Sequence, residues 1–192
     1  MAEFIYYAVY KPYGVISQFT PETPGDATLA SLHSFPSDVY PVGRLDKDSE
    51  GLLILTNDTS VNSQMLGPSS KKNKTYLAQL EGIISQEALD HIGAGITINV
   101  NGESYFTHPC EIVLIDAPNN IPERYPPVRY RANKPTSWIK ITLAEGKNRQ
   151  IRKMCAATGY PVLRLIRISF GKYALTKLLP GSVTQIKKKD LL

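Results

Sequence analysis

Most patterned segments of the chain show either a two-residue alternation of apolar and polar side chains or a short apolar run, and both patterns are typical of β-strands. One such run, GLLILT at residues 51–56, has the length and the boundaries of a buried strand. Asn101-Gly102 is a two-residue turn, so ITINV and ESYF are predicted to form a β-hairpin. We expect the other strands at residues 4–10, 74–82, 110–116, 136–143, 161–170 and 182–186.

Helical patterns are fewer, and each has a recognisable start or stripe. Asn57 or Asp58 can cap a first helix that ends near Leu66. Ser85 can cap a second helix that ends near Gly93. A third helix has an apolar stripe that consists of Ile151, Met154, Cys155 and Thr158. Because strands outnumber helices and short turns join many neighbours, we predict an α+β protein with a largely antiparallel sheet.

Residues 117–135 contain prolines at five positions and are predicted to hold no regular structure. The segment also mixes cations with tyrosines, namely Arg124, Tyr125, Arg129, Tyr130, Arg131 and Lys134. Such cations can contact phosphates, and such tyrosines can stack on unpaired bases. A solubilising loop would show the same composition, so both interpretations stay open.

The composition of the chain restricts the possible classes of protein but does not indicate a function. The 192 residues suffice for one domain, the net charge is +5 and the sequence pI is about 9.1. A basic chain favours polyanionic partners, although charge alone is a weak signal. The two cysteines form no CxxC pair and the three histidines are scattered, so we expect no metal and no disulfide. The start resembles no signal peptide and no apolar run is long enough for a membrane span, so we expect a cytoplasmic protein.

The stretch GRLDKDSEGLLILTND, residues 43–58, places three acids at alternate positions before the apolar run. A calcium loop is excluded, because its last position falls on Asn57 where a bidentate glutamate is needed. A two-carboxylate glycosidase would need a defined separation across the scissile bond, which nothing in the stretch enforces. For Asp48 and Glu50 we expect a solvated turn, the usual environment of carboxylates.

Asp46 differs from the other two acids because Arg44 lies two residues before it. On an extended chain the intervening Leu45 would point to the opposite face. An aspartate near guanidinium groups has a lowered pKa and stays ionised, and an ionised carboxylate can act as a nucleophile or stabilise an oxocarbenium-like centre. A structural ion pair explains the same triplet.

A second basic cluster lies at the start of the third helix, where cations oppose the helix macrodipole. Arg149, Arg152 and Lys153 form this cluster, and a phosphate or a buried carboxylate nearby would offset the cost. A solvated helix face is the alternative. KKNKTY adds Lys71, Lys72 and Lys74 as candidate phosphate contacts before Tyr76, for which, taken singly, we favour the role of a core tyrosine.

Four motifs together resemble, in order, those of the RsuA-type pseudouridine synthases: KPYGV (11–15), GRLDKDSEGLLILTND (43–58), KTYLAQLEG (74–82) and EGKNRQIRKMCAATGYPVLRLIRISFG (145–171). The resemblance covers nearly the whole chain. It implies a mixed, mostly antiparallel sheet in two lobes with a catalytic cleft between them, all within one catalytic domain of residues 1–192. The first predicted strand leads directly to KPYGV, so we expect no S4-type RNA-binding domain.

The resemblance also implies roles for individual residues. Asp46 matches the catalytic aspartate, Tyr76 the tyrosine that packs on the target base, and Arg152 the arginine that forms a salt bridge with the aspartate. Substrate or RNA contacts are then expected from Arg44, Leu45, Ile151, Arg149, Lys153, Lys71, Lys72, Lys74, Arg129 and Arg131.

The implied reaction converts one uridine of 23S ribosomal RNA to pseudouridine without a cofactor. We expect 23S rRNA or a large-subunit precursor as the partner, and a monomeric protein. The competing interpretation is a non-catalytic rRNA-binding or ribosome-assembly factor on the same fold. A nucleotide-dependent enzyme is not indicated, because the chain has neither a P-loop nor a GxGxxG motif.

Overall fold

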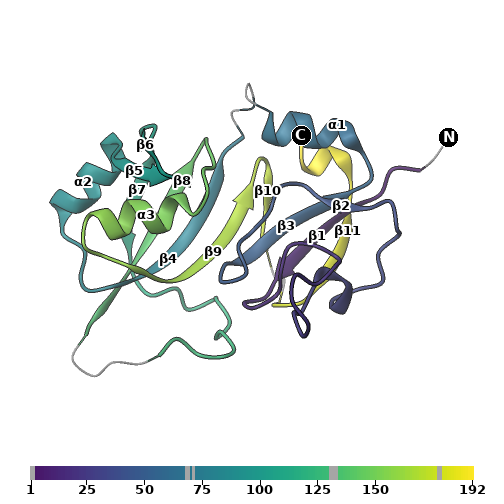
Figure 1. Ribbon diagram of the computed structural model, residues 1–192, viewed down its shortest axis with the longest axis horizontal. Helices are drawn as coiled ribbons and strands as arrows, with labels where there is room; N and C mark the ends of the chain where they lie inside the picture. Colours follow the sequence, from purple (N-terminus) through teal and green to yellow (C-terminus); the bar gives the residue numbers. More distant parts are fainter. Residues whose placement is uncertain (1–2, 68–69, 71, 130–133, 177–178) are drawn as a thin grey trace. The chain divides into compact units, whose positions relative to one another are not determined.

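The computed structural model describes residues 3–67, 70, 72–129, 134–176 and 179–192. Contacts within the chain divide it into two compact units (Figure 1). Unit 1 consists of residues 1–72 and 166–192, and unit 2 of residues 73–165. Strand β9 (Val162–Phe170) contributes its first half to unit 2 and its second half to unit 1.

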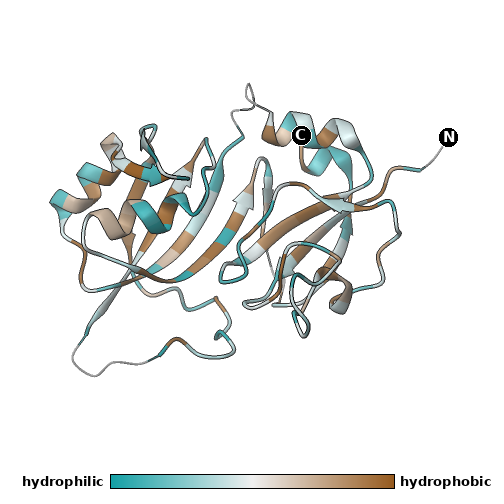
Figure 2. Ribbon diagram, viewed as in Figure 1, coloured by the Kyte–Doolittle hydropathy of each residue, from teal (hydrophilic) through white to brown (hydrophobic). Residues whose placement is uncertain are grey.

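Unit 1 contains strands in the order β11-β1-β3-β9. Strand β1 pairs antiparallel with β11 and with β3, and β3 pairs parallel with β9 at Glu50–Ile166 and Gly51–Arg167. Every residue of β3 is buried, which confirms the buried strand predicted from GLLILT (Figure 2). The short strands β2 and β10 were not predicted. The strands that complete this unit are β1 (Tyr6–Lys11), β2 (Tyr40–Pro41), β3 (Glu50–Thr56), β10 (Tyr173–Ala174) and β11 (Val183–Ile186).

Helix α1 (Thr59–Leu66) begins where the sequence predicted, with Asp58 as its N-cap. The Asp58 carboxylate accepts hydrogen bonds from the Ser60 amide at 3.0 Å and the Tyr6 hydroxyl at 2.8 Å. It also pairs with the Lys188 ammonium at 2.7 Å, which ties the helix start to the C-terminal 3-10 turn (Lys188–Asp190). The core of unit 1 consists of Tyr6, Ala8, Val42, Leu52, Ile54, Val61, Met65, Phe170 and Leu191.

Unit 2 contains strands in the order β9-β4-β8-β7 and a separate hairpin, β5-β6. Strand β8 pairs antiparallel with β4 along its whole length and with β7. At the hairpin turn Asn101 and Gly102 both have positive φ values, 55° and 93°, as the two-residue turn requires. The strands are β4 (Lys74–Glu81), β5 (Thr97–Val100), β6 (Glu103–Phe106), β7 (Glu111–Ile115) and β8 (Thr136–Leu143).

Helices α2 (Gln86–Ala94) and α3 (Gln150–Ala157) bury their apolar sides in the core of unit 2 (Figure 1). Ser85 caps α2 through a hydrogen bond to the Ala88 amide, as predicted. Within the predicted stripe of α3, Ile151, Met154 and Cys155 are buried. Helix α3 ends at Ala157, and the described parts of 117–135 contain no helix or strand. The predicted α+β class with a mostly antiparallel sheet is therefore confirmed.

Candidate active site

Asp46 lies in the loop between β2 and β3 and is half-buried. Leu45 beside it is only 6% exposed, whereas Arg44 is exposed. The 44–46 triplet belongs to no strand, yet the buried leucine separates an exposed cation from a partly accessible acid. The loop therefore anchors itself through Leu45 and leaves the Asp46 carboxylate partly accessible.

The main chain on both sides of Asp46 is held by the end of KPYGV and by Ser17, two residues beyond it. The Ser17 hydroxyl donates to the Leu45 carbonyl at 2.7 Å and accepts from the Leu45 amide at 3.0 Å. The Gly14 amide donates to the Lys47 carbonyl at 2.8 Å, so the residues before and after Asp46 are both tied to residues 14–17. The Ser49 amide donates to the carbonyl of Asp46 itself at 3.0 Å. Ser17 was not among the predicted site residues, because an isolated serine is part of no recognisable sequence motif.

Lys11, the first residue of KPYGV, is fully buried. Its ammonium donates to the Val15 carbonyl at 2.6 Å and the Pro12 carbonyl at 3.0 Å. Burial lowers the pKa of Lys11 to about 8, and the negative charges of Glu50, Asp48 and Asp46 oppose that shift. The negative charges of Asp46, Asp48 and Glu50 thus all act on the buried ammonium group of Lys11.

The predicted solvated turn is wrong for Glu50, which is only 2% exposed, and Asp48 is half-buried. The physical reason is that β3 starts at Glu50, one residue before the apolar run, and Glu50 pairs with Ile166 of β9. The charge of Glu50 in turn favours the charged form of buried Lys11.

The glycine after Glu50 allows the close approach of β3 and β9. Gly51 has φ +100°, and a Cβ atom there would lie 2.3 Å from the Arg167 carbonyl oxygen. Arg167 is 3% exposed, donates from Nε to the Leu52 carbonyl at 2.7 Å, and lies over the Phe170 ring at 5.0 Å. These contacts brace the end of the Asp46 loop where it enters β3.

In unit 2, Tyr76 and Arg152 occupy separate elements. Tyr76 lies on β4 opposite Ile141, is half-buried, and packs against the core of this unit. Arg152 lies on α3, is half-buried, and donates from Nη1 to the Val162 carbonyl at 3.2 Å. Ile151, expected to line the pocket, is 4% exposed and belongs to the core cluster.

The basic end of α3 is built differently from an ordinary helix start. Arg149 is the N-cap residue, is exposed, and adopts a left-handed conformation with φ 52°. The first turn of α3 carries no acid. Glu145, five residues before Gln150, accepts a hydrogen bond from the Gln150 side chain, so a half-buried carboxylate lies near the helix start. Lys153, the other cation of the cluster, is half-buried.

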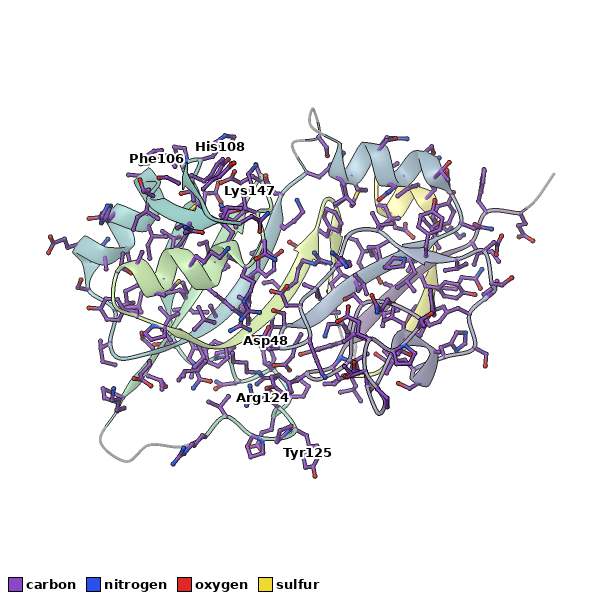
Figure 3. The ribbon with its side chains drawn as sticks, viewed as in Figure 1. Asp48, Phe106, His108, Arg124, Tyr125 and Lys147 are labelled. Atoms are coloured by element: carbon purple, nitrogen blue, oxygen red, sulfur yellow. The ribbon has the colours of Figure 1, made fainter. Side chains whose placement is uncertain are left out.

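The remaining predicted RNA contacts have different environments. Arg129 is exposed and Lys72 half-buried, whereas Lys74 is only 9% exposed. Lys71 and Arg131 lie outside the described residues. Arg124, labelled with Tyr125 in Figure 3, donates to the carbonyls of Pro126, Pro127 and Leu163.

No cluster of metal-ligating side chains was found among the described residues. Both cysteines carry free thiols. None of the helices in the described ranges combines the length and the apolar character needed to cross a membrane.

Comparison with known proteins identifies the family. Residues 5–157, which include Asp46, Tyr76 and Arg152, match the family model described as RNA pseudouridylate synthase. A ribosomal large subunit pseudouridine synthase E from Vibrio parahaemolyticus is 45% identical over 177 residues, covering 92% of this chain and 71% of that protein. A protein of the same name from Xanthomonas axonopodis pv. citri is 42% identical, covering 88% and 87% of the two chains.

The fold comparison agrees with the family match. A crystal structure of a pseudouridylate synthase superposes with a TM-score of 0.79 at 23% identity, covering all of this chain and 74% of the other. The chain therefore belongs to the RNA pseudouridylate synthase family. It is an enzyme that isomerises uridine in RNA to pseudouridine.

Proposed function

We propose that this enzyme acts on one uridine of large-subunit ribosomal RNA, with Asp46 as the catalytic residue. Two kinds of support converge. Relatives at 42–45% identity are named as synthases of the ribosomal large subunit. The observation that carries the assignment of Asp46 is its setting: a partly accessible carboxylate whose neighbouring peptide groups are hydrogen-bonded to Ser17 and Gly14. Such fixation is what a reacting group needs.

The reaction moves a base without net loss or gain of atoms. The C1′–N1 glycosidic bond breaks, the uracil turns, and a new C1′–C5 bond forms. The proton on C5 is lost to solvent, and N1 takes up a proton. Asp46 promotes the cleavage, either by attack on C1′ or by stabilising an intermediate formed after C2′ deprotonation. The target uridine must leave its stack first, because the glycosidic bond is unreachable inside a helix.

Tyr76 and Arg152 complete the proposed catalytic set. Tyr76 would pack on the target base, and Arg152 would form a salt bridge with the aspartate, as the family resemblance implies. Arg44 would help to hold the extruded nucleotide, and its exposure suits a contact with the RNA. Excluding water during the reaction matters, because water would hydrolyse the intermediate.

The decisive experiment compares Asp46→Asn with Asp48→Asn on rRNA labelled with tritium at C5 of uridine. Asp46→Asn should abolish tritium release while it binds the RNA as tightly as the wild type. Asp48→Asn changes the same loop and the same charge, and should keep most of the activity. Normal turnover by Asp46→Asn would refute the catalytic assignment.

A second experiment separates the enzyme from a non-catalytic rRNA-binding factor. Carbodiimide labelling followed by primer extension on rRNA from a deletion strain should show one pseudouridine missing. An unchanged map would refute the rRNA substrate.

As part of the proposal, the enzyme works as a monomer in the cytoplasm, within the one catalytic domain of residues 1–192, and needs no cofactor. Sedimentation of the protein alone would test the monomer.

A further inference from the structure

Phe106, at the end of β6, is an exposed aromatic residue on a rigid support. We propose that Phe106, with His108 and Lys147 beside it, forms a stacking platform for an unpaired base of the RNA substrate. In this platform the ring stacks on the base and the two basic side chains contact the adjoining phosphates. The inference rests on the proposed function for its ligand, an RNA with unpaired nucleotides.

The position of the Phe106 ring is set by Gly95. Phe106 is 63% exposed, yet a Cβ atom at Gly95 would lie 3.0 Å and 3.2 Å from two of its ring carbons. Gly95 has φ +102°, and a side chain there would also meet the Thr107 carbonyl at 2.5 Å. The ring therefore lies close against a main chain without a side chain, while most of the residue faces solvent.

The backbone that carries Phe106 is also held. Thr107 is fully buried, its hydroxyl accepts from the Ile96 amide at 2.9 Å, and its own amide donates to the Ile96 carbonyl at 3.1 Å. A stacking residue that is already ordered loses less conformational entropy when RNA binds than a mobile one. The hydrogen bonds of Thr107 therefore pre-organise the platform.

The half-buried carboxylate of Glu145 connects the backbone of His108 to Tyr105 of β6. Glu145 accepts from the Tyr105 hydroxyl at 2.6 Å, from the His108 amide at 2.9 Å and from the Gln150 side chain. The Lys147 ammonium lies 4.5 Å from the centre of the Tyr105 ring. Figure 3 shows Phe106, His108 and Lys147 gathered at one end of unit 2.

The chemistry of the surroundings favours an RNA base over a protein partner. A single exposed apolar side chain is ordinary by itself and far too small for a protein interface. Here the side chain is aromatic, and the side chain of His108, two residues along the chain, is 70% exposed. Exposed Lys147, Asn148 and Arg149 continue the basic surface toward α3. An aromatic ring next to cations is the arrangement by which proteins bind single-stranded nucleic acid.

The test replaces the ring and measures RNA affinity at one fixed salt concentration. Phe106→Ala should weaken binding of an rRNA stem-loop with the target uridine by roughly tenfold or more. Turnover at saturating RNA should stay unchanged, because the platform binds and does not react. Phe106→Leu keeps apolar surface without a π face and should bind almost as poorly, whereas Phe106→Tyr should bind like the wild type. Ile83→Ala is the matched control, since Ile83 is 59% exposed in the same unit.

A second readout does not depend on comparing affinities. Trp138 is the one tryptophan of the chain, so the double variant Phe106→Trp, Trp138→Phe places a single indole at the platform. Its fluorescence should be quenched by an oligouridine strand. An unquenched indole, or wild-type affinity of Phe106→Ala, would overturn the platform. Full rescue by Phe106→Leu would also overturn it, because apolar contact would then suffice.

These outcomes can be told apart from failure of the proposed function. If the wild type isomerises uridine and Phe106→Ala binds RNA normally, the platform is wrong and the enzymatic proposal stands. If the wild type leaves large-subunit rRNA unmodified but its RNA affinity depends on the Phe106 ring, the platform stands and the proposed substrate fails.

Discussion

The hydroxyl group of Ser17 makes two hydrogen bonds to one residue, donating to the carbonyl of Leu45 and accepting from its amide. Ser17 is 5% exposed, so water does not compete for either bond. A side chain that hydrogen-bonds both the amide and the carbonyl of one residue fixes the position of the residue next to it. That residue is Asp46, and the Ser17 contact therefore connects the segment after KPYGV to the proposed catalytic loop.

Removing this hydroxyl should damage catalysis more than RNA binding. In Ser17→Ala the Leu45 amide and carbonyl lose a buried partner, which costs about 1–3 kcal/mol of the free energy of unfolding. A displaced Asp46 carboxylate should lower kcat by roughly 10- to 100-fold, because small misplacements of a reacting group have effects of that order. Steady-state tritium release would separate kcat from KM.

Ser49→Ala is a matched control for that experiment. Ser49 lies in the loop that contains Asp46 and is 2% exposed, but no hydrogen-bond partner was found for its hydroxyl among the described residues. Its removal should therefore change kcat less than twofold. Equal losses of kcat in the two variants would show that replacing any buried serine near Asp46 has this effect, and would refute the positioning role of Ser17.

Gly51→Ala should be strongly destabilising. The new Cβ atom would overlap the Arg167 carbonyl, and the residue would keep a φ of +100° that alanine avoids. Because β3 and β9 pair at this residue, we expect a loss of more than about 2 kcal/mol in the free energy of unfolding, measured with urea. Gly25→Ala has a similar φ of +91° and open space around it, so it isolates the conformational cost. Similar losses in both variants would refute the steric argument.

Local patterns in the sequence were sufficient for most elements of the fold. The caps at Asp58 and Ser85 and the Asn101-Gly102 turn were all predicted correctly. These features depend on a few neighbouring residues, so a single sequence contains the needed information. The two-residue strand β2 is defined by its pairing with β3, and β10 by a tight turn back onto the end of β9, and neither is long enough to show a periodic pattern.

The candidate site was less predictable, because its environment depends on residues far apart in the chain. Glu50 looked like a solvated acid until its pairing with β9 and the burial of Lys11 were known. Nothing in the sequence around Ser17 indicates that its hydroxyl reaches Leu45, 28 residues away. The roles of Asp46, Tyr76 and Arg152 came from the family resemblance and stay predictions.

Arg149 has a backbone conformation that an arginine seldom adopts, with φ 52° at the N-cap of α3. Non-glycine residues in that region usually serve a function that outweighs the strain. Arg149→Gly removes the cation and relieves the strain, so the free energy of unfolding should change by less than about 1 kcal/mol. RNA affinity should fall, and the slope of log K against log salt should decrease by about 0.7–0.9.

Lys189→Ala is the control for the salt dependence, since it removes an exposed cation from the C-terminal turn. Its salt slope should equal that of the wild type. A wild-type slope for Arg149→Gly would remove Arg149 from the phosphate contacts. A large loss of stability in the same variant would instead show that the arginine side chain supports the helix start.

Asp58 should make the stability of unit 1 depend on pH in the acid range. Burial alone would raise the pKa of Asp58, but hydrogen bonds from Lys188, Ser60 and Tyr6 outweigh it and hold the pKa below its ordinary value. A carboxyl group with a lowered pKa in the folded state contributes stability above its unfolded pKa of about 3.9, and loses that contribution as the pH falls toward the folded value.

Asp58→Asn should therefore lower the free energy of unfolding by roughly 1–3 kcal/mol at pH 7, because the half-buried Lys188 ammonium loses its charge partner. The difference from the wild type should shrink as the pH falls below about 4, where Asp58 of the unfolded chain takes up a proton while the folded carboxylate, with its lowered pKa, is still charged. Urea unfolding at pH 7, 4 and 3 measures both effects. Asp38→Asn, in which an exposed carboxylate that accepts from Asn57 is replaced, should show neither. A loss for Asp58→Asn that stays constant across this range would mean that the geometry of the hydrogen bonds around this side chain, and not its charge, accounts for the role of Asp58.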